Sequence, residues 1–157
     1  MSFRCVAMST EVADRFRRSD RDDSGNRIEH RVADKDTGFF CRHCLGQPAK
    51  GRKVLLANYH VERPKGVYWS PSPVFVHADR DACPRFVQEN EIPKAVRDLR
   101  LVGLRSYDAE DHMLYDLTVL TEDVHQRVEK FLGDPRTTYV NIHSSGPGCY
   151  LCRVERL

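Results

Sequence analysis

Residues 101–132 read LVGLRSYDAEDHMLYDLTVLTEDVHQRVEKFL, and this stretch decides the fold class. Residues 101–107 and 113–119 each suit a β-strand, and the polar residues 108–111 lie between them. Two strand-like runs joined by a short polar loop predict an antiparallel β-hairpin.

A helix is predicted directly after this hairpin. Thr121 suits the N-cap, and Glu122 and Asp123 follow in the first turn, where carboxylates interact favourably with the helix dipole. Four residues at helical spacing form one apolar stripe: Val124, Val128, Phe131 and Leu132. Gly133 and Pro135 predict the end of the helix. The hairpin and helix together indicate a sheet with a helix packed against it.

The rest of the chain extends this arrangement. Short helices are predicted after Ser9 or Thr10 and at Pro93, where capping residues or a first-turn proline precede apolar positions. Further strands are predicted at residues 3–8, 28–33, 54–59, 74–77, 139–143 and 150–154. Strands and helices do not alternate regularly, so a doubly wound fold is excluded. We expect an α+β protein: a curved, mostly antiparallel sheet of about seven strands with two or three helices on one side.

Length and composition favour one globular domain over residues 1–157. Hydrophobic residues make up 40% of the 157 residues, charged residues make up 31%, and the net charge is only +2. A charge this small does not favour a nucleic-acid or membrane partner, and no apolar run is long enough to span a bilayer. The first residues lack the features of a secretory signal, so we expect a cytoplasmic protein. Disulfides are rare in that compartment, which leaves thiols, a metal site or a redox role for the six cysteines.

Two Cys-x-x-Cys pairs are the most informative motif. Cys41 and Cys44 form the first, and Cys149 and Cys152 form the second. A two-residue gap lets two thiolates reach one tetrahedral metal from a tight turn, so the four cysteines predict a zinc site. Because more than a hundred residues separate the pairs, this prediction requires the fold to bring them together.

Strand geometry raises an objection to a four-cysteine site. If Cys149 and Cys152 belong to one regular strand, their side chains point to opposite faces. A smaller site would then combine Cys41 with Cys149, and His143 or His43 could join it as a metal ligand or beside a reactive thiol. Buried cysteines without a metal are the third interpretation, because free cysteine packs as a small hydrophobic residue.

An enzyme is the alternative to a zinc-stabilised binding or interaction domain. Cys149 or Cys41 beside His143 would provide a nucleophile and a base. Three arginines lie near these motifs and would suit an anionic small molecule if they share a face with the cysteines: Arg42, Arg105 and Arg153. Ordinary surface ion pairs of these arginines are the competing interpretation.

Several motifs together carry a family resemblance over nearly the whole chain. They are GFFCR at 38–42, VLL at 54–56 with Tyr59, SPVFV at 72–76, LRSYD at 104–108, DPR at 134–136, and His143-x-x-x-x-Gly148-Cys149-Tyr150 with Arg153. In these positions the chain resembles the bacterial proteins grouped as domain of unknown function 1203. That family supplies no reaction.

The resemblance implies that Cys41, Arg42, His143 and Cys149 belong to a shared site. The family pattern has a proline where this chain has Phe40, and it generally lacks the second cysteine of each pair. It therefore implies that Cys44 and Cys152 are an elaboration of this branch, one that recruits zinc.

Overall fold

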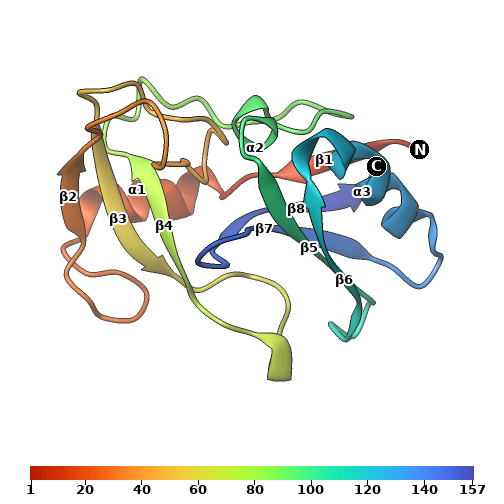
Figure 1. Ribbon diagram of the computed structural model, residues 1–157. Coiled ribbons are helices and arrows are strands. Elements are labelled where there is room, and N and C mark those ends of the chain that lie inside the picture. Colours follow the sequence, from red (N-terminus) through yellow and green to blue (C-terminus); the bar gives the residue numbers. More distant parts are fainter.

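The computed structural model of the protein describes residues 1–157, in which eight strands form two antiparallel sheets. The two sheets lie side by side (Figure 1). The larger has the strand order β1-β8-β7-β5-β6, with β1 (Phe3–Val6), β5 (Leu101–Tyr107), β6 (Met113–Leu120), β7 (Tyr139–Ser144) and β8 (Tyr150–Arg156). The smaller has the order β2-β3-β4, with β2 (Glu29–Val32), β3 (Lys53–Tyr59) and β4 (Ser72–His77).

Each sheet has a helix of its own. Helix α1 (Thr10–Arg18) packs against the smaller sheet, and helix α3 (Val124–Gly133) packs against the larger one. The remaining helical segments are short: α2 (Lys94–Arg97), η1 (Gly66–Tyr68) and η2 (Thr121–Asp123). The predicted α+β class is confirmed, whereas the single sheet that we expected is divided into two.

The division into two sheets has a local cause at the outer edge of β4. Cys41 forms an isolated parallel bridge with Phe75, and the backbone N–H of Arg42 donates to the Phe75 carbonyl at 3.0 Å. These contacts occupy the edge at which β4 would otherwise accept another strand. The turn that carries the first cysteine pair therefore ends the smaller sheet.

The predicted hairpin and helix are both present. Strands β5 and β6 pair in antiparallel register, and the Asp108 carboxylate accepts hydrogen bonds from the backbone N–H groups of Glu110 and His112 in the connecting loop. The apolar stripe of α3 is buried as expected. Thr121 does not act as an N-cap, because its hydroxyl donates to the Leu99 carbonyl and it begins the 3₁₀ turn η2 instead.

Two hydrophobic cores correspond to the two sheets. The core of the larger sheet includes Leu104 and Ile142 from the sheet and Leu132 from α3. The core of the smaller sheet includes Phe16 from α1, Val74 from β4 and the thiols of Cys41 and Cys83. The first cysteine pair therefore lies at the core of the smaller sheet, to which Tyr150 of β8 also contributes.

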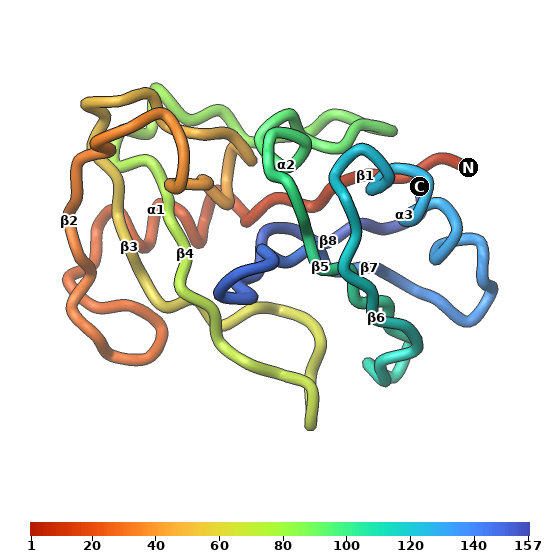
Figure 2. Tube along the Cα trace, viewed as in Figure 1, coloured from red at the N-terminus to blue at the C-terminus, as the bar shows by residue number.

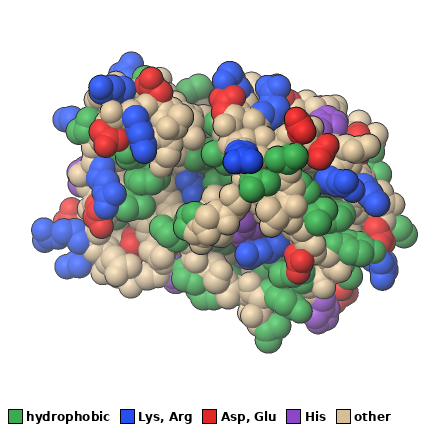
Figure 3. Space-filling view, viewed as in Figure 1, with side chains coloured by type: hydrophobic (Ala, Val, Ile, Leu, Met, Phe, Trp, Pro, Cys, Tyr) green, Lys and Arg blue, Asp and Glu red, His purple; other side chains and the backbone are tan.

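The chain ends meet at one end of the larger sheet. Residue Phe3 of β1 pairs with Arg156 of β8, and the Cα trace shows both termini there (Figure 2). None of the helices has the length and apolar character that a membrane crossing requires. Basic and acidic side chains are interspersed over the face in Figure 3, as the small net charge of +2 would suggest.

A cross-strand leucine pair tests the packing of the larger sheet. Leu104 is fully buried, whereas its partner Leu117 on the edge strand β6 is 40% exposed. We expect Leu104→Ala to lower the free energy of unfolding by about 2–5 kcal/mol, because it leaves a cavity in the core. Leu117→Ala is the matched control and should cost less than about 1 kcal/mol. Equal losses in urea unfolding would contradict this packing.

Candidate metal centre

The first Cys-x-x-Cys pair lies in a tight turn. The backbone N–H of Cys41 donates to the Gly46 carbonyl at 2.9 Å, which closes the turn around Cys44. Leu45 has a positive φ of 50°, a left-handed conformation that lets the chain reverse directly after the second cysteine. The turn that we predicted from the two-residue gap is therefore present.

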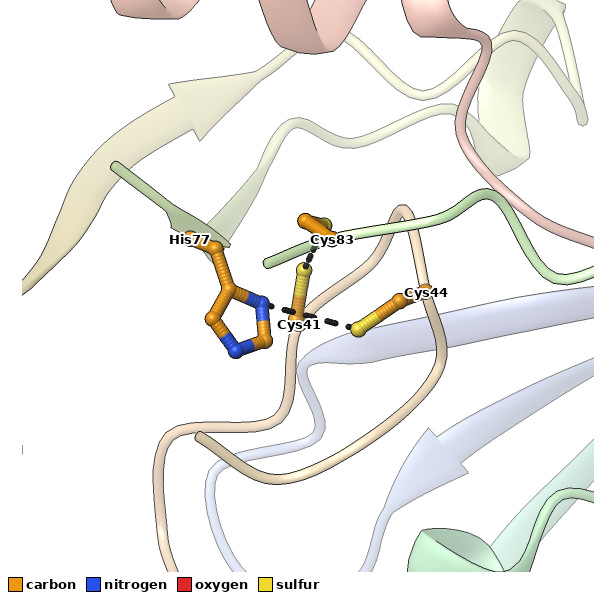
Figure 4. A group of neighbouring side chains, drawn as sticks. All are labelled: Cys41, Cys44, His77 and Cys83. Carbon is orange, nitrogen blue, oxygen red and sulfur yellow. Dashed lines mark hydrogen bonds between the residues drawn. The ribbon is translucent and has the colours of Figure 1, made fainter. Parts of the chain in front are cut away.

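Two residues distant in sequence join this pair. His77 is the last residue of β4, and Cys83 lies in the loop that follows. The ligating atoms of Cys41, Cys44, His77 and Cys83 all lie within 4.8 Å of one another. Figure 4 shows their side chains converging, with the Cys41 and Cys83 sulfurs 3.6 Å apart and the Cys44 sulfur 3.5 Å from His77 Nδ1. Three segments thus meet at one Cys₃His cluster.

The cluster has the donors and spacing of a tetrahedral metal site. Three sulfurs and one imidazole nitrogen are one of the usual ligand sets of structural zinc. With Zn–S bonds of about 2.3 Å, a tetrahedron places two sulfur ligands about 3.8 Å apart. The 3.6 Å between the Cys41 and Cys83 sulfurs is close to this edge. The 3.5 Å between the Cys44 sulfur and His77 Nδ1 is close to the sulfur–nitrogen edge of about 3.5 Å that a Zn–N bond of about 2.0–2.1 Å gives. This group can therefore hold a metal ion.

His43 supports the cluster from outside it. Its Nδ1 lies 3.2 Å from the Cys83 sulfur, and its Nε2 lies 2.9 Å from the Thr10 hydroxyl at the start of α1. A thiolate accepts from an N–H, so this arrangement suits a ring that donates from Nδ1 and accepts from the hydroxyl at Nε2. His43 thereby links the cluster to α1.

The cluster favours negative charge on Cys83. Hydrogen bonds from the Cys41 and Cys44 thiols, and then from His43 and His77, lower the pKa of Cys83 well below its usual value. Hydrogen bonding to the Cys41 and Cys83 sulfurs raises the pKa of His77 to about 9. Hydrogen bonding to Cys41 and Cys83 raises the pKa of Cys44. A bound cation would replace the protons that these groups share.

Arg42 ties the two sheets together. Its buried guanidinium donates to the Tyr150 carbonyl of β8 at 2.7 Å, to the Pro73 carbonyl of β4 at 3.5 Å and to the Phe40 carbonyl. Burial lowers the pKa of Arg42 to about 10, which still leaves it charged at neutral pH. We predicted that Arg42 binds an anionic molecule, but the structure directs its hydrogen bonds to backbone carbonyls.

The second Cys-x-x-Cys pair does not reach the cluster. Cys152 lies on β8 in the core of the larger sheet, where its hydrogen bond to Cys5 raises the pKa of the Cys5 thiol. Cys149 precedes β8 and lines a separate cavity. The predicted cage of four cysteines is therefore not assembled: Cys152 is buried in the core of the larger sheet and Cys149 lines a cavity, whereas Cys41 and Cys44 meet His77 and Cys83.

Arg153 and Arg105, the other two arginines predicted to bind an anion, have different partners. Arg153 forms ion pairs with Glu155 at 2.6 Å and with Glu62 at 3.5 Å, which matches the competing interpretation of a surface ion pair. Arg105 has no carboxylate within 4.0 Å and lines the same cavity as Cys149. Arg105 thus differs from Arg153 in having no carboxylate partner, although its side chain shares a hydrogen bond with Tyr107.

His143 and Cys149 line this cavity together without forming a catalytic pair. His143 Nδ1 lies 3.0 Å from the Gly148 carbonyl, and no hydrogen bond joins the ring to the Cys149 sulfur. Burial, followed by repulsion from Arg105, lowers the pKa of His143 to about 4. In this structure the ring therefore lacks the contact with the thiol that a catalytic Cys–His pair makes.

A family model described as "Protein of unknown function (DUF1203)" matches residues 38–156, which is most of the chain. The chain belongs to this family. Searches of curated proteins and of solved structures found no match. The DUF1203 resemblance that the sequence motifs indicated is confirmed.

The DUF1203 region contains two metal-cluster residues that our sequence reasoning missed. We interpreted His77 as an ordinary histidine at a strand end and Cys83 as a lone thiol. The available signals were weak: a histidine closing a buried strand, and a cysteine six residues later, before Pro84. Only the path of the loop after β4 shows that both turn toward Cys41 and Cys44.

Arg42 provides a test of this local structure. We expect Arg42→Met to lower the free energy of unfolding by about 2–4 kcal/mol, because it leaves buried carbonyls without donors. Arg4→Met is the control: Arg4 is exposed and makes one ion pair with Glu155, so its loss should cost less than about 1 kcal/mol. Similar small losses for both variants in urea unfolding would show that Arg42 does not join the sheets.

Proposed function

We propose that the protein is a zinc-stabilised binding domain in which Cys41, Cys44, His77 and Cys83 hold one zinc ion. The observation that carries the proposal is the convergence of these four ligating atoms within 4.8 Å. Four protein ligands complete a tetrahedral zinc site and leave no position for substrate or water. The proposed zinc is therefore structural and not catalytic.

The site supports a part of the chain with little regular structure. Between His77 and β5 the only helix is the four-residue α2, so few ladder hydrogen bonds hold this segment. Zinc would join Cys83 in that segment to the 41–44 turn and to the end of β4. Because the unfolded chain lacks a preformed site, the free energy of metal binding would contribute to folding.

A disulfide is the competing use of these thiols. The Cys41 and Cys83 sulfurs are 3.6 Å apart, which is much longer than the bond of about 2.05 Å in a disulfide. A Cys41–Cys83 disulfide would also leave Cys44 and His77 beside it without a role. A shared cation uses all four groups, which is why zinc is the better interpretation.

The metal content of purified protein tests the proposal. We expect about one zinc per chain, measured by elemental analysis after native purification. Cys44→Ser and Cys83→Ser should each lose most of the zinc, because a serine hydroxyl is a poor ligand for this ion. Cys149→Ser is the matched control, since Cys149 lies outside the cluster, and it should retain zinc.

The zinc content of two variants and of the native protein distinguishes this site from a site of four cysteines and from a protein without zinc. His77→Cys gives four thiolate ligands, another usual set of structural zinc, and should retain zinc even if the serine variants fold poorly. Loss of zinc from Cys149→Ser would point back to a cage of four cysteines, and native protein without zinc would overturn the proposal.

Zinc removal should also lower stability. A chelator should lower the melting temperature, and restored zinc should recover it. At free zinc about 1,000 times its dissociation constant, binding adds about 4 kcal/mol to the free energy of unfolding. Protein that keeps its melting temperature after complete zinc removal would contradict a structural role.

A further inference from the structure

Strand β6 forms a free edge of the larger sheet. It is the last strand in the order β1-β8-β7-β5-β6, and it runs for eight residues, Met113–Leu120. A strand at an edge leaves every second residue with an unpaired backbone N–H and C=O, and these groups can pair with a strand of another chain. The edge of β6 is therefore a surface on which an extended segment can dock.

The pairing with β5 shows which residues of β6 face outward. The backbone N–H of Tyr115 donates to Ser106 Oγ of β5 at 3.1 Å, and the register is regular from there to Leu120. Tyr115 and every second residue after it therefore face β5. Asp116 and Thr118 lie between them and direct their backbone N–H and C=O groups outward, where no loop supplies a backbone hydrogen bond.

The three other sheet edges are protected, which sets β6 apart. The edge of β4 is occupied by the turn at Cys41, and the edge of β1 by Asn90, whose N–H donates to the Phe3 carbonyl at 2.8 Å. Strand β2 is only four residues long, and three of its side chains are ionisable. Short length and charge are common forms of protection for an edge. Strand β6 is twice as long as β2, and Asp116 is its only charged residue.

Apolar side chains also remain exposed on β6. Tyr115 is 37% exposed, Leu117 is 40% exposed and Leu120 is 43% exposed, and these are three of the ten exposed large hydrophobic residues of the chain. A neighbouring strand would cover these side chains and would pair the outward backbone groups at the same time. Backbone and side chains thus both indicate that β6 pairs with another strand.

Two copies of β6 fit each other in one register. In an antiparallel pair, outward-facing residues lie opposite outward-facing residues, so even-numbered positions of the two copies must match. The two-fold axis between the strands then passes through a residue. An axis at Asp116 would set two carboxylates opposite each other, which is destabilising. An axis at Leu117 avoids this repulsion and pairs residues 114–120 of both copies.

The axis at Leu117 also brings complementary side chains together. Leu117 meets Leu117 of the second copy in a non-hydrogen-bonded pair, in which side chains approach closely. Asp116 lies opposite Thr118 of the second copy, whose hydroxyl can donate to the carboxylate. We propose that the protein forms a symmetric dimer by antiparallel pairing of two β6 strands, with Leu117 at the two-fold axis. Dimers with one two-fold axis are the commonest protein oligomers, and this dimer does not depend on zinc.

The mass of the protein in solution tests the proposal. Sedimentation velocity of the zinc-loaded protein, from micromolar to millimolar concentration, should show a monomer that passes into a dimer, because one pair of strands is a small interface. Protein that stays monomeric over this range would leave the edge to another partner or to none, and it would overturn the proposal. Assemblies larger than a dimer would also overturn it, since the pairing uses up the unprotected edge of each copy.

Two substitutions of the exposed Thr118 test the register. Thr118→Glu sets a second carboxylate opposite Asp116 of the other copy, whereas Thr118→Lys sets an opposite charge there. Because each dimer contains two such pairs, the dissociation constant of Thr118→Glu should exceed that of Thr118→Lys by about tenfold. Zinc content is measured for both variants, so that a failed metal site is distinguished from a failed interface. Equal dissociation constants would contradict the register.

A disulfide across the axis provides a second measurement. The Cα atoms of a non-hydrogen-bonded pair lie about 4.5 Å apart, which is within reach of a disulfide. Leu117→Cys should therefore form a covalent dimer with oxidised glutathione, and peptide mapping should find the bond between the two introduced thiols. Leu114→Cys is the matched control, because the register places this position opposite residue 120 and far from its own copy. No bond at position 117, or equal bonding at both positions, would overturn the proposed pairing.

Discussion

Three sulfurs and one imidazole converge within 4.8 Å at the end of the smaller sheet, where they bring three segments of the chain together. The turn that holds Cys41 and Cys44 also closes the edge of β4, so the cluster and the end of the sheet depend on the same few residues. Cys83 connects the loop after β4 to the cluster, and this loop has little regular structure of its own. A cation at this point would join the three segments of the chain. Hydrophobic packing alone gives a short three-stranded sheet little stability.

Arg42 extends this constraint to the larger sheet. It follows Cys41 directly, and its guanidinium reaches the carbonyl of Tyr150 at the start of β8. Tyr150 follows Cys149, so Arg42 connects the surroundings of Cys41 with those of Cys149. The site residues implied by the DUF1203 resemblance lie in these two neighbouring regions. Cys41 belongs to the Cys₃His cluster, and His143 and Cys149 line the cavity. The residues that the resemblance assigned to one shared site therefore lie in two places in the fold, with Arg42 between them.

The sequence predicted the local features well, because their signals lie within a few residues. The β5–β6 hairpin, the buried stripe of α3 and the turn at Cys41 and Cys44 each follow from short-range spacing. The division into two sheets could not be predicted in this way, because it depends on which segment reaches the free edge of β4. The partners of the first cysteine pair were missed for the same reason. His77 and Cys83 carry no motif, and Cys149 and Cys152 carry one that the fold places at a cavity and in the core of the larger sheet, away from the cluster.

A crystal structure with anomalous scattering recorded at the zinc absorption edge tests the central claim most directly. The account predicts one zinc peak per chain, bound by the sulfurs of Cys41, Cys44 and Cys83 at about 2.3 Å and by the imidazole of His77 at about 2.0–2.1 Å. A peak beside Cys149 or Cys152, or zinc-loaded protein in which these four residues hold no metal, would contradict it.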